Sequence, residues 1–304
     1  MGMFDVTNKP DTLRRAVALA SVKTSPETIQ LIKEGRSPKG DIIEAAKIAA
    51  TMAAKKTWEL LPYCHSIPID NVKVDVELKE SSIEVRVETK TVWKTGVEME
   101  SLTAASIGAL TIYDMLKPVD DNLSIESIKL LEKSGGIKGV VENSSRKLRA
   151  AVLVVSDSTS QGTREDKSGK LAVERLEKNG FEISEYAVVA DDLSSIESSL
   201  AKFCDQLKVD LVVTTGGTGI GPRDVTPEAT KKIMEKEMAG LSEAMRTYGQ
   251  RRTPLSMLSR GVSGVRGKTL IVNMPGSVKA VSESFEALFP GLLHIYKMLG
   301  GYGH

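Results

Sequence analysis

Two charged side chains near the middle of the sequence have the types and the spacing that proton transfer needs. Asp114 and Lys117 lie three positions apart in YDMLK, so on a helix they are neighbours. An exposed ion pair is the simplest interpretation of this spacing. The segment from Leu102 to Tyr113 carries almost no charge, which indicates that the pair ends a buried helix and favours a role in chemistry.

A histidine and two glutamates extend this chemistry. His65 lies in a loop between Pro62 and Pro68, whose rings restrict the backbone and hold the imidazole in place. If the extended pattern continues through TGVEMES, Glu98 and Glu100 project from one face, and one of their pKa values rises. A hydrogen-bonded loop histidine and a solvated strand face are the alternatives.

Two segments have the features of anion-binding sites. Lys39 lies in SPKGD, beside the start of a predicted helix, and a helix N-terminus with a nearby lysine suits a phosphate. In TTGGTGIGPRDVTPEAT, a Gly-rich turn follows an apolar strand and leads into a helix, with Thr226 as the expected N-cap and Pro227 at N1. An exposed loop lysine and a tight turn without ligand are the alternatives. GGTG matches neither the P-loop nor the dinucleotide fingerprint.

The elements of the first half indicate an α+β domain. Residues 41–61 have helical periodicity, with Asp41 as a possible N-cap. Residues 72–78 and 83–92 alternate like the strands of an antiparallel hairpin, and 102–117 form a second helix. We expect an antiparallel sheet with helices on one face, in a ferredoxin-like arrangement.

The second half alternates short apolar strands with helices, which predicts a doubly wound α/β domain with a mostly parallel sheet. Loops at 154–162 and 273–277 also follow apolar strands, so three loops are expected to meet at one edge of the sheet. The junction at 134–147 is polar and glycine-rich. We therefore predict domains at 1–143 and 149–304, joined by a linker at 144–148.

The overall composition is that of soluble globular protein. The 304 residues include 41 Lys+Arg and 40 Asp+Glu, with 41% hydrophobic residues, which excludes a disordered or collagen-like chain. No apolar run is long enough to cross a membrane, and neither half is basic enough to suggest a nucleic-acid partner. Cys64 and Cys204 lie in different halves, so no bridge is expected and a cytoplasmic location is predicted.

The first half resembles a known family of enzymes. FDVTNKP, GRSPKGD, AAKKTWELLPYCHSIP, KTGVEMESLTAASIGALTIYDMLKP and KSGG occur in this order over residues 3–139, and they are similar to cyclic pyranopterin monophosphate synthase of molybdenum cofactor biosynthesis. The resemblance implies that a cyclised dihydroguanosine triphosphate is rearranged to cyclic pyranopterin monophosphate with release of diphosphate, without a cofactor.

The resemblance also implies roles for particular residues. Asp114 is the expected catalytic acid or base, with Lys117 as its partner. The expected substrate-binding residues are Tyr63, Cys64, His65, Glu98, Met99 and Glu100, and the phosphate-binding candidates are Lys39 and Arg14. We expect the site to combine chains of a homo-oligomer, a trimer or hexamer.

Over residues 149–290 the second half resembles the molybdopterin-binding family that includes molybdopterin adenylyltransferase. This resemblance implies Mg²⁺ and ATP, with Asp224 as a catalytic and metal-binding residue and Asp191 as a second metal ligand, although the adjacent Asp192 leaves that register open. The expected pterin- and nucleotide-binding residues are Ser156, Asp157, Gly216, Gly217, Thr218, Gly219, Pro275, Gly276 and Ser277.

The sequence therefore predicts a bifunctional enzyme of molybdenum cofactor biosynthesis, with a lyase in the N-terminal half and a nucleotidyltransferase in the C-terminal half. Its ligands are pterins and nucleotides, and other proteins of the pathway are possible partners. In an alternative, the second half is a non-catalytic molybdopterin carrier or scaffold. A more remote alternative is a nucleotide-binding regulator.

Overall fold

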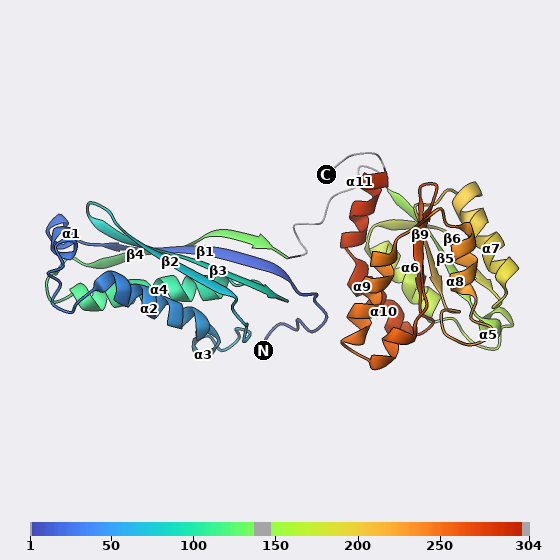
Figure 1. Cartoon of the computed structure of the whole chain (residues 1–304), viewed down its shortest axis with the longest axis horizontal. Coiled ribbons are helices and arrows are strands. Elements are labelled where there is room, and N and C mark those ends of the chain that lie inside the picture. Colours follow the sequence, from blue (N-terminus) through green and yellow to red (C-terminus); the bar gives the residue numbers. More distant parts are fainter. Residues whose placement is uncertain (1, 137–146, 300–304) are drawn as a thin grey trace. The chain divides into compact units, whose positions relative to one another are not determined.

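The chain folds into two compact units, Met1–Gly139 and Val140–His304. A computed structural model describes residues 2–136 and 147–299 (Figure 1). The predicted linker at 144–148 lies mostly outside these residues, so the exact domain boundary stays a prediction. Leu148, at the end of that segment, is the first residue of a strand.

The N-terminal unit is the expected α+β domain. Its antiparallel sheet has the order β2-β3-β1-β4, and the chain order βαββαβ makes it ferredoxin-like. Helices α2 and α4 cover one face (Figure 1). The elements are β1 (Thr12–Lys23), α1 (Pro26–Lys33), α2 (Ile42–Lys55), α3 (Thr57–Leu60), β2 (Asn71–Leu78), β3 (Ser82–Trp93), α4 (Glu98–Leu116) and β4 (Ser124–Gly135).

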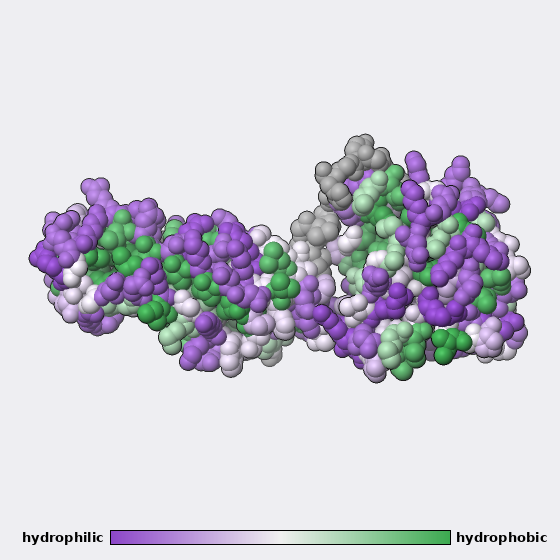
Figure 2. Space-filling view, in the orientation of Figure 1, coloured by the Kyte–Doolittle hydropathy of each residue, from purple (hydrophilic) through white to green (hydrophobic). Residues whose placement is uncertain are grey.

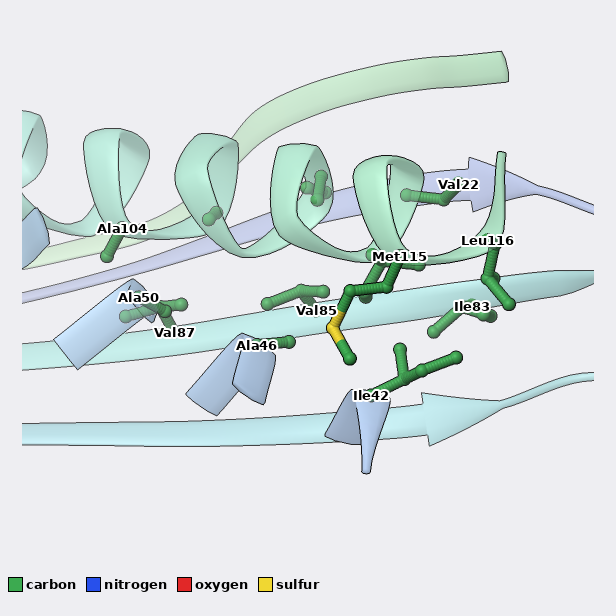
Figure 3. Packing of buried hydrophobic residues seen from close by; sticks show 14 of the residues in the cluster. Val22, Ile42, Ala46, Ala50, Ile83, Val85, Val87, Ala104, Met115 and Leu116 are labelled. Atoms are coloured by element: carbon green, nitrogen blue, oxygen red, sulfur yellow. The ribbon is translucent and has the colours of Figure 1, made fainter. Parts of the chain in front are cut away.

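Small side chains bring α4 close to the sheet and to α2. A Cβ atom added to Gly108 would lie 2.9 Å from Val85 Cγ1 and 3.5 Å from the Cβ of Ala50, so only glycine fits there without a shift. Apolar residues of both helices and of β3 complete the core (Figure 3). The capping prediction is confirmed for α2, because the Asp41 carboxylate accepts from the Glu44 N–H at 3.0 Å.

One expectation for this unit is wrong. Residues 98–100 are not extended, because α4 begins at Glu98, four residues before the predicted helix. On a helix, residues two positions apart do not share a face. Glu98 therefore pairs with Lys133 on β4, whereas Glu100 is buried with 2% of its surface exposed.

The C-terminal unit has the predicted doubly wound, mostly parallel sheet. Its order is β6-β5-β7-β10-β9-β8, in which the first four strands are parallel and β9 pairs antiparallel with both β10 and β8. The strands are β5 (Leu148–Val155), β6 (Phe181–Val189), β7 (Leu211–Thr215), β8 (Lys236–Glu237), β9 (Ser263–Arg266) and β10 (Thr269–Met274).

Helices cover both faces of this sheet. Alternate residues of β5 belong to two cores: Ala150, Val152 and Val154 pack on the side of α6 and α10, and Ala151 and Leu153 on the side of α7 and α8. The helices are α5 (Asp157–Ser160), α6 (Ser168–Lys178), α7 (Leu193–Ala201), α8 (Thr226–Ile233), α9 (Ala239–Gln250), α10 (Val278–Leu288) and α11 (Ile295–Leu299), with a π-helical turn at Lys202–Gln206 and 3₁₀ turns at Pro254–Leu258 and Gly291–His294.

Two further observations concern the surface and the cysteines. Polar side chains cover much of the visible face, interrupted by small apolar patches (Figure 2). Among the described residues, no helix is long and apolar enough to span a bilayer. Cys64 and Cys204 are free thiols, as expected, and Cys204 is a buried core residue.

Candidate functional sites

The C-terminal end of α4 holds a carboxylate between two lysines. The Lys117 Nζ lies 2.8 Å from one Asp114 carboxylate oxygen, and the Lys39 Nζ lies 2.8 Å from the other. Lys39 also donates to the Asp114 backbone carbonyl at 2.9 Å. Hydrogen bonds from Lys117 and then Lys39 lower the pKa of Asp114 to about 2. The sequence predicted the first pair, and the fold adds Lys39 to it.

The opposite end of α4 holds a buried carboxyl group. Burial raises the pKa of Glu100, because a charged carboxylate loses its hydration there. The Cys64 thiol donates to Glu100 Oε1 at 3.6 Å, while the buried Oε2 has no hydrogen-bond partner among the residues that the structure describes. Burial, followed by the Glu100 charge, raises the pKa of Cys64 to about 11.

The other predicted substrate-binding residues lie around Glu100 and Cys64. His65 Nε2 is 2.8 Å from the Phe4 carbonyl, and Tyr63 and Met99 are exposed. Arg14 donates to the carbonyls of Trp93 and Lys94, each at 3.2 Å. These side chains offer proton donors, acceptors and a cation to a ligand.

Within one chain, these two groups of residues do not form one site. Glu100 and Asp114 are fourteen positions apart on α4, which at about 1.5 Å per residue places them about 21 Å apart. The sequence predicted one site that combines chains, but it did not indicate that the two groups lie at opposite ends of α4. A pocket that contains both groups requires a second copy of the chain.

In the C-terminal unit, two predicted aspartates hold each other in place. The Asp157 N–H donates to the Asp191 carboxylate at 2.8 Å, and the Asp191 N–H donates to Asp157 Oδ1 at 3.0 Å. Burial raises the pKa of Asp191, and the charges of Asp157 and Asp224 add to the rise. Arg223 binds the Asp157 carboxylate with two nitrogens, at 2.7 and 3.1 Å.

The two adjacent aspartates, Asp191 and Asp192, have different surroundings. Asp192 caps α7: its Oδ2 accepts from the Ser195 N–H at 2.9 Å and from the Ser194 hydroxyl at 2.7 Å. These hydrogen bonds, the one from Ser194 first, lower the pKa of Asp192 to about 2. Asp191, and not Asp192, therefore lies with the other carboxylates.

The Gly-rich turn after β7 contacts the turns after β5 and β10. Gly216 and Gly217 have φ values of 99° and 61°, which glycine adopts readily. A Cβ on Gly216 would lie 2.1 Å from the Val155 carbonyl oxygen, and one on Gly276 would lie 3.3 Å from the Gly216 Cα. The three predicted loops thus meet at the C-terminal edge of the sheet, where doubly wound folds bind ligands.

The predicted cap at Thr226 is wrong by one residue. Thr226 is the first residue of α8, Val225 is the N-cap, and no side chain caps the helix. The Thr226 hydroxyl instead donates to the Gly216 carbonyl at 3.0 Å. This residue therefore secures the Gly-rich turn to the helix that follows.

The remaining predicted residues shape the loops. Asp224 Oδ2 accepts from the Gly221 N–H at 2.8 Å. The hydroxyls of Ser156 and Ser277 accept from the N–H groups of Thr159 and Ala280, at 3.3 and 3.2 Å, and so cap α5 and α10.

Sequence reasoning missed a pocket beside the third loop. It is lined by residues that include Ser242, Arg246, Ser256, Asn273, Pro275 and Glu283. Pro275 was predicted, and Asn273 lies in the predicted loop at 273–277. The other four come from segments that carry no recognisable spacing, and the fold alone brings them together.

Comparisons with known proteins match each half of the chain to a different family. Residues 3–136 match the MoaC family, and residues 151–294 match the family described as a probable molybdopterin binding domain. The fold and sites thus define a synthase-like domain and a molybdopterin-binding-type domain in one chain.

Relatives with both domains exist. The molybdenum cofactor biosynthesis bifunctional protein of Chlorobaculum tepidum is 38% identical over 99% of this chain and 96% of its own length. The protein of the same name from Synechococcus elongatus is 36% identical over 99% and 98%. The cyclic pyranopterin monophosphate synthase of Thermomicrobium roseum is 50% identical over 45% of this chain and 84% of its own length. The chain belongs to the family of molybdenum cofactor biosynthesis bifunctional proteins.

Proposed function

We propose that the N-terminal unit converts (8S)-3',8-cyclo-7,8-dihydroguanosine 5'-triphosphate to cyclic pyranopterin monophosphate and diphosphate. The observation that carries this proposal is the Lys39–Asp114–Lys117 cluster. It places two cations around one carboxylate, and release of diphosphate needs cations where negative charge develops. The relationship to a synthase of this name supports the choice of substrate.

The charge state of Asp114 determines whether it first accepts or first donates a proton in the reaction. With a pKa of about 2, Asp114 is a carboxylate at neutral pH, so it accepts a proton before it can donate one. When substrate phosphates draw Lys39 and Lys117 towards themselves, the two hydrogen bonds that stabilise the charged form weaken. The pKa of Asp114 then rises, which makes the protonated group available as an acid later in the cycle.

The buried end of α4 supplies a different environment. Glu100 is 2% exposed and retains an unpaired oxygen, so a ligand with N–H groups, such as a guanine-derived ring, offers it the donors that it lacks. Because about 21 Å of helix separates this group from Asp114, we propose that the site forms between chains of a homo-oligomer with threefold symmetry.

For the C-terminal unit we propose adenylylation of molybdopterin by Mg²⁺-ATP. Three carboxylates, of Asp157, Asp191 and Asp224, are close enough that two of them raise the pKa of the third, and a divalent cation would relieve this repulsion. Among the described residues, no group of three or more such side chains forms a ready metal site. Mg²⁺ commonly uses one or two carboxylates together with nucleotide phosphates and water.

The residues present therefore fit a metal that arrives with its nucleotide. Asp191 and Asp224 would hold it, and the bound ion would neutralise the charge of the ATP phosphates during transfer. The chain itself contributes the Gly-rich turn, whose backbone can approach a phosphate closely, and Arg223, which keeps Asp157 ionised and in place.

A direct assay separates the proposals. The intact protein is given the cyclised nucleotide, and in a second reaction molybdopterin with ATP and Mg²⁺, and the products are identified by mass spectrometry. We expect cyclic pyranopterin monophosphate with diphosphate in the first reaction and adenylylated molybdopterin in the second. Molybdopterin binding without adenylylation would support a carrier instead. Failure to release diphosphate would reject the lyase proposal.

A further inference from the structure

The start of α4, the helix that carries Glu100, is held by a buried residue of the sheet. Thr89 lies on β3 and is 0% exposed. Its Oγ1 donates to the Val97 carbonyl at 3.1 Å and lies 2.6 Å from the Ser101 Oγ. The Ser101 hydroxyl in turn donates to the Ala16 carbonyl of β1 at 3.1 Å. Because α4 starts without a side-chain cap, these hydroxyl contacts hold its first turn against the sheet.

A second threonine of β3 holds the loop that carries Cys64. Thr91 is 1% exposed, and its Oγ1 donates to the Pro68 carbonyl at 2.5 Å. Two residues further on, Asp70 is fixed to β3 as well, by hydrogen bonds of its N–H and its carboxylate at 3.0 and 2.8 Å. The end of the loop is therefore fastened to β3 around Thr91.

Thr89 and Thr91 continue a line of core side chains along β3. Residues two positions apart on a strand project from one face, and Val85 and Val87 of this face pack in the core with α2 and α4 (Figure 3). Valine has nearly the shape of threonine, and a buried hydroxyl costs free energy unless it is hydrogen-bonded. The two threonines therefore differ from the valines before them in what they bind, and not in the space that they fill.

We propose that Thr89 and Thr91 are positioning residues, which fix Glu100 and Cys64 relative to each other for binding of a ligand. One strand sets both the first turn of α4 and the end of the loop, and the thiol-to-carboxylate contact of 3.6 Å joins the two segments. The threonines are too deeply buried to touch the ligand themselves. That the ligand is a guanine-derived ring rests on the proposed function of this unit, whereas the effect on Glu100 and Cys64 does not.

The reactivity of Cys64 reports on this geometry without any substrate. Burial, then the charge and hydrogen bond of Glu100, and finally the charge of Glu98 keep the thiol protonated, and only the thiolate reacts with iodoacetamide. If α4 or the loop shifts, the thiol gains water and loses its contact with Glu100, so its pKa falls towards the ordinary value. The rate of alkylation as a function of pH therefore measures how closely the two segments are held.

Thr28 offers a matched control in the same unit. It is 3% exposed, and its hydroxyl also makes two contacts, each at 3.0 Å, with Asp120 Oδ2 and the Ser25 Oγ. These partners lie at the junction of β1 and α1 and after the C-terminal end of α4. Replacement of Thr28 by valine thus removes a comparable buried hydroxyl at the end of α4 that does not carry Glu100.

The experiment compares Thr89→Val/Thr91→Val, Thr89→Ser/Thr91→Ser and Thr28→Val with the wild type, each in the full chain. Alkylation of Cys64 is followed by peptide mass spectrometry over a range of pH, and folding by thermal unfolding. We expect the double valine variant to alkylate about tenfold faster than the wild type at about pH 8, which corresponds to a fall of about one unit in the pKa of Cys64. The double serine variant, which keeps both hydroxyls, and Thr28→Val should react like the wild type.

Turnover of the cyclised nucleotide gives a second readout. In the double valine variant KM should rise more than kcat falls, because the Asp114 cluster at the other end of α4 is unchanged. If this variant does not fold, the single variants Thr89→Val and Thr91→Val take its place, and each should give part of the acceleration.

The outcomes separate the inference from the function. Alkylation at the wild-type rate in the valine variants, or an equal acceleration in Thr28→Val, would overturn the positioning role. Equal acceleration in the double serine variant would overturn it as well, because the hydroxyls would then not be what holds the segments. Faster alkylation in the valine variants alone, with a wild type that does not turn over the nucleotide, would support the positioning role and reject the synthase.

Discussion

At the scale of single residues, the same side-chain type has opposite roles in different surroundings. Asp114 lies between two lysines and is held ionised, whereas Glu100 lies in the core and its charged form is disfavoured. The residue types and motifs of both were visible in the sequence. A raised pKa for one of Glu98 and Glu100 was expected from their assumed common face, but its main cause is the burial of Glu100. The effect of Lys39 on Asp114 was not predicted, because only the fold brings the two together.

Replacement of the exposed carboxylate should abolish turnover and leave folding intact. We expect Asp114→Asn to lower kcat for diphosphate release by about 10²- to 10⁴-fold, the range for loss of a positioned acid or base. Asp75→Asn is the control, because Asp75 also pairs with a lysine at 2.8 Å but lies on β2, away from the cluster. Steady-state kinetics test this, and a fully active Asp114→Asn enzyme would contradict the assignment.

The half-buried Cys64 thiol should be slow to react. With its pKa raised to about 11, Cys64 is almost entirely a thiol at pH 8, and the thiolate is the reactive form. We expect alkylation of native Cys64 by iodoacetamide to be roughly 100-fold slower than that of an exposed cysteine. Peptide mass spectrometry gives the rate, with the urea-unfolded protein as control. Equal rates in the native and unfolded protein would disprove the burial effect.

At the scale of elements, the sequence predicted the strands whose residues follow a strand pattern and missed strands that lack one. The β2–β3 hairpin and the parallel strands were predictable because their residues alternate or form short apolar runs. The central strand β1 and the edge strand β4 were not predicted. β1 is rich in alanine, and β4 is largely exposed and charged, so neither has the usual strand signature.

The two misplaced helix starts have a common cause. Both α4 and α8 begin without a side-chain cap, after Val97 and Val225. Cap residues are the strongest local signal for a helix start, and neither start has one. By contrast, α2 and α7 start at the aspartates Asp41 and Asp192, whose carboxylates accept from the backbone.

One buried aspartate joins three elements of the N-terminal unit. The Asp120 carboxylate, after α4, accepts from the hydroxyls of Thr24 and Thr28 and from the N–H groups of Ser25 and Asn122, at 2.6 to 3.0 Å. Burial alone would raise the pKa of Asp120, but these hydrogen bonds outweigh it and lower the pKa to about 2. The charged form thus stabilises the junction of β1, α1 and α4.

The stability of this unit should therefore fall in acid. A folded pKa below the unfolded one stabilises the protein above about pH 4, and this contribution is lost as the pH falls to about 2. We expect Asp120→Asn to lower the unfolding free energy by about 2 kcal/mol at pH 7 and to show a smaller deficit near pH 2.

Tryptophan fluorescence reports this transition, because both tryptophans, Trp58 and Trp93, belong to the N-terminal unit. The exposed neighbour Asp121 gives the control variant Asp121→Asn, which should match the wild type. A deficit for Asp120→Asn that stays constant with pH would contradict the ionised junction.

At the scale of the whole molecule, α4 divides the chemistry of the N-terminal unit between its two ends. Each chain has one complete set of groups, but a single copy keeps them about 21 Å apart. The sequence predicted the residues and an oligomer, and it contained no information about which residues share a pocket within one chain.

If the site forms between chains, two inactive variants should complement each other. Asp114→Asn and Glu100→Gln are each expected to lack activity alone. When they are unfolded together, mixed equally and refolded, about a quarter of the sites should combine an intact group from each chain. Activity near a quarter of the wild-type value supports a shared site. No recovery in mixed oligomers, confirmed by mass spectrometry, argues that one chain carries the whole site.

The positions in the sequence of the loops at the C-terminal edge of the second sheet determine when these loops can come together during translation. They come from residues near 156, 216 and 276, so the chain must be synthesised beyond residue 276 before these loops can meet. The groups on α4 and β1 precede residue 118, and domains generally fold as they emerge. During translation, the N-terminal unit is therefore able to fold while the C-terminal unit is still being synthesised.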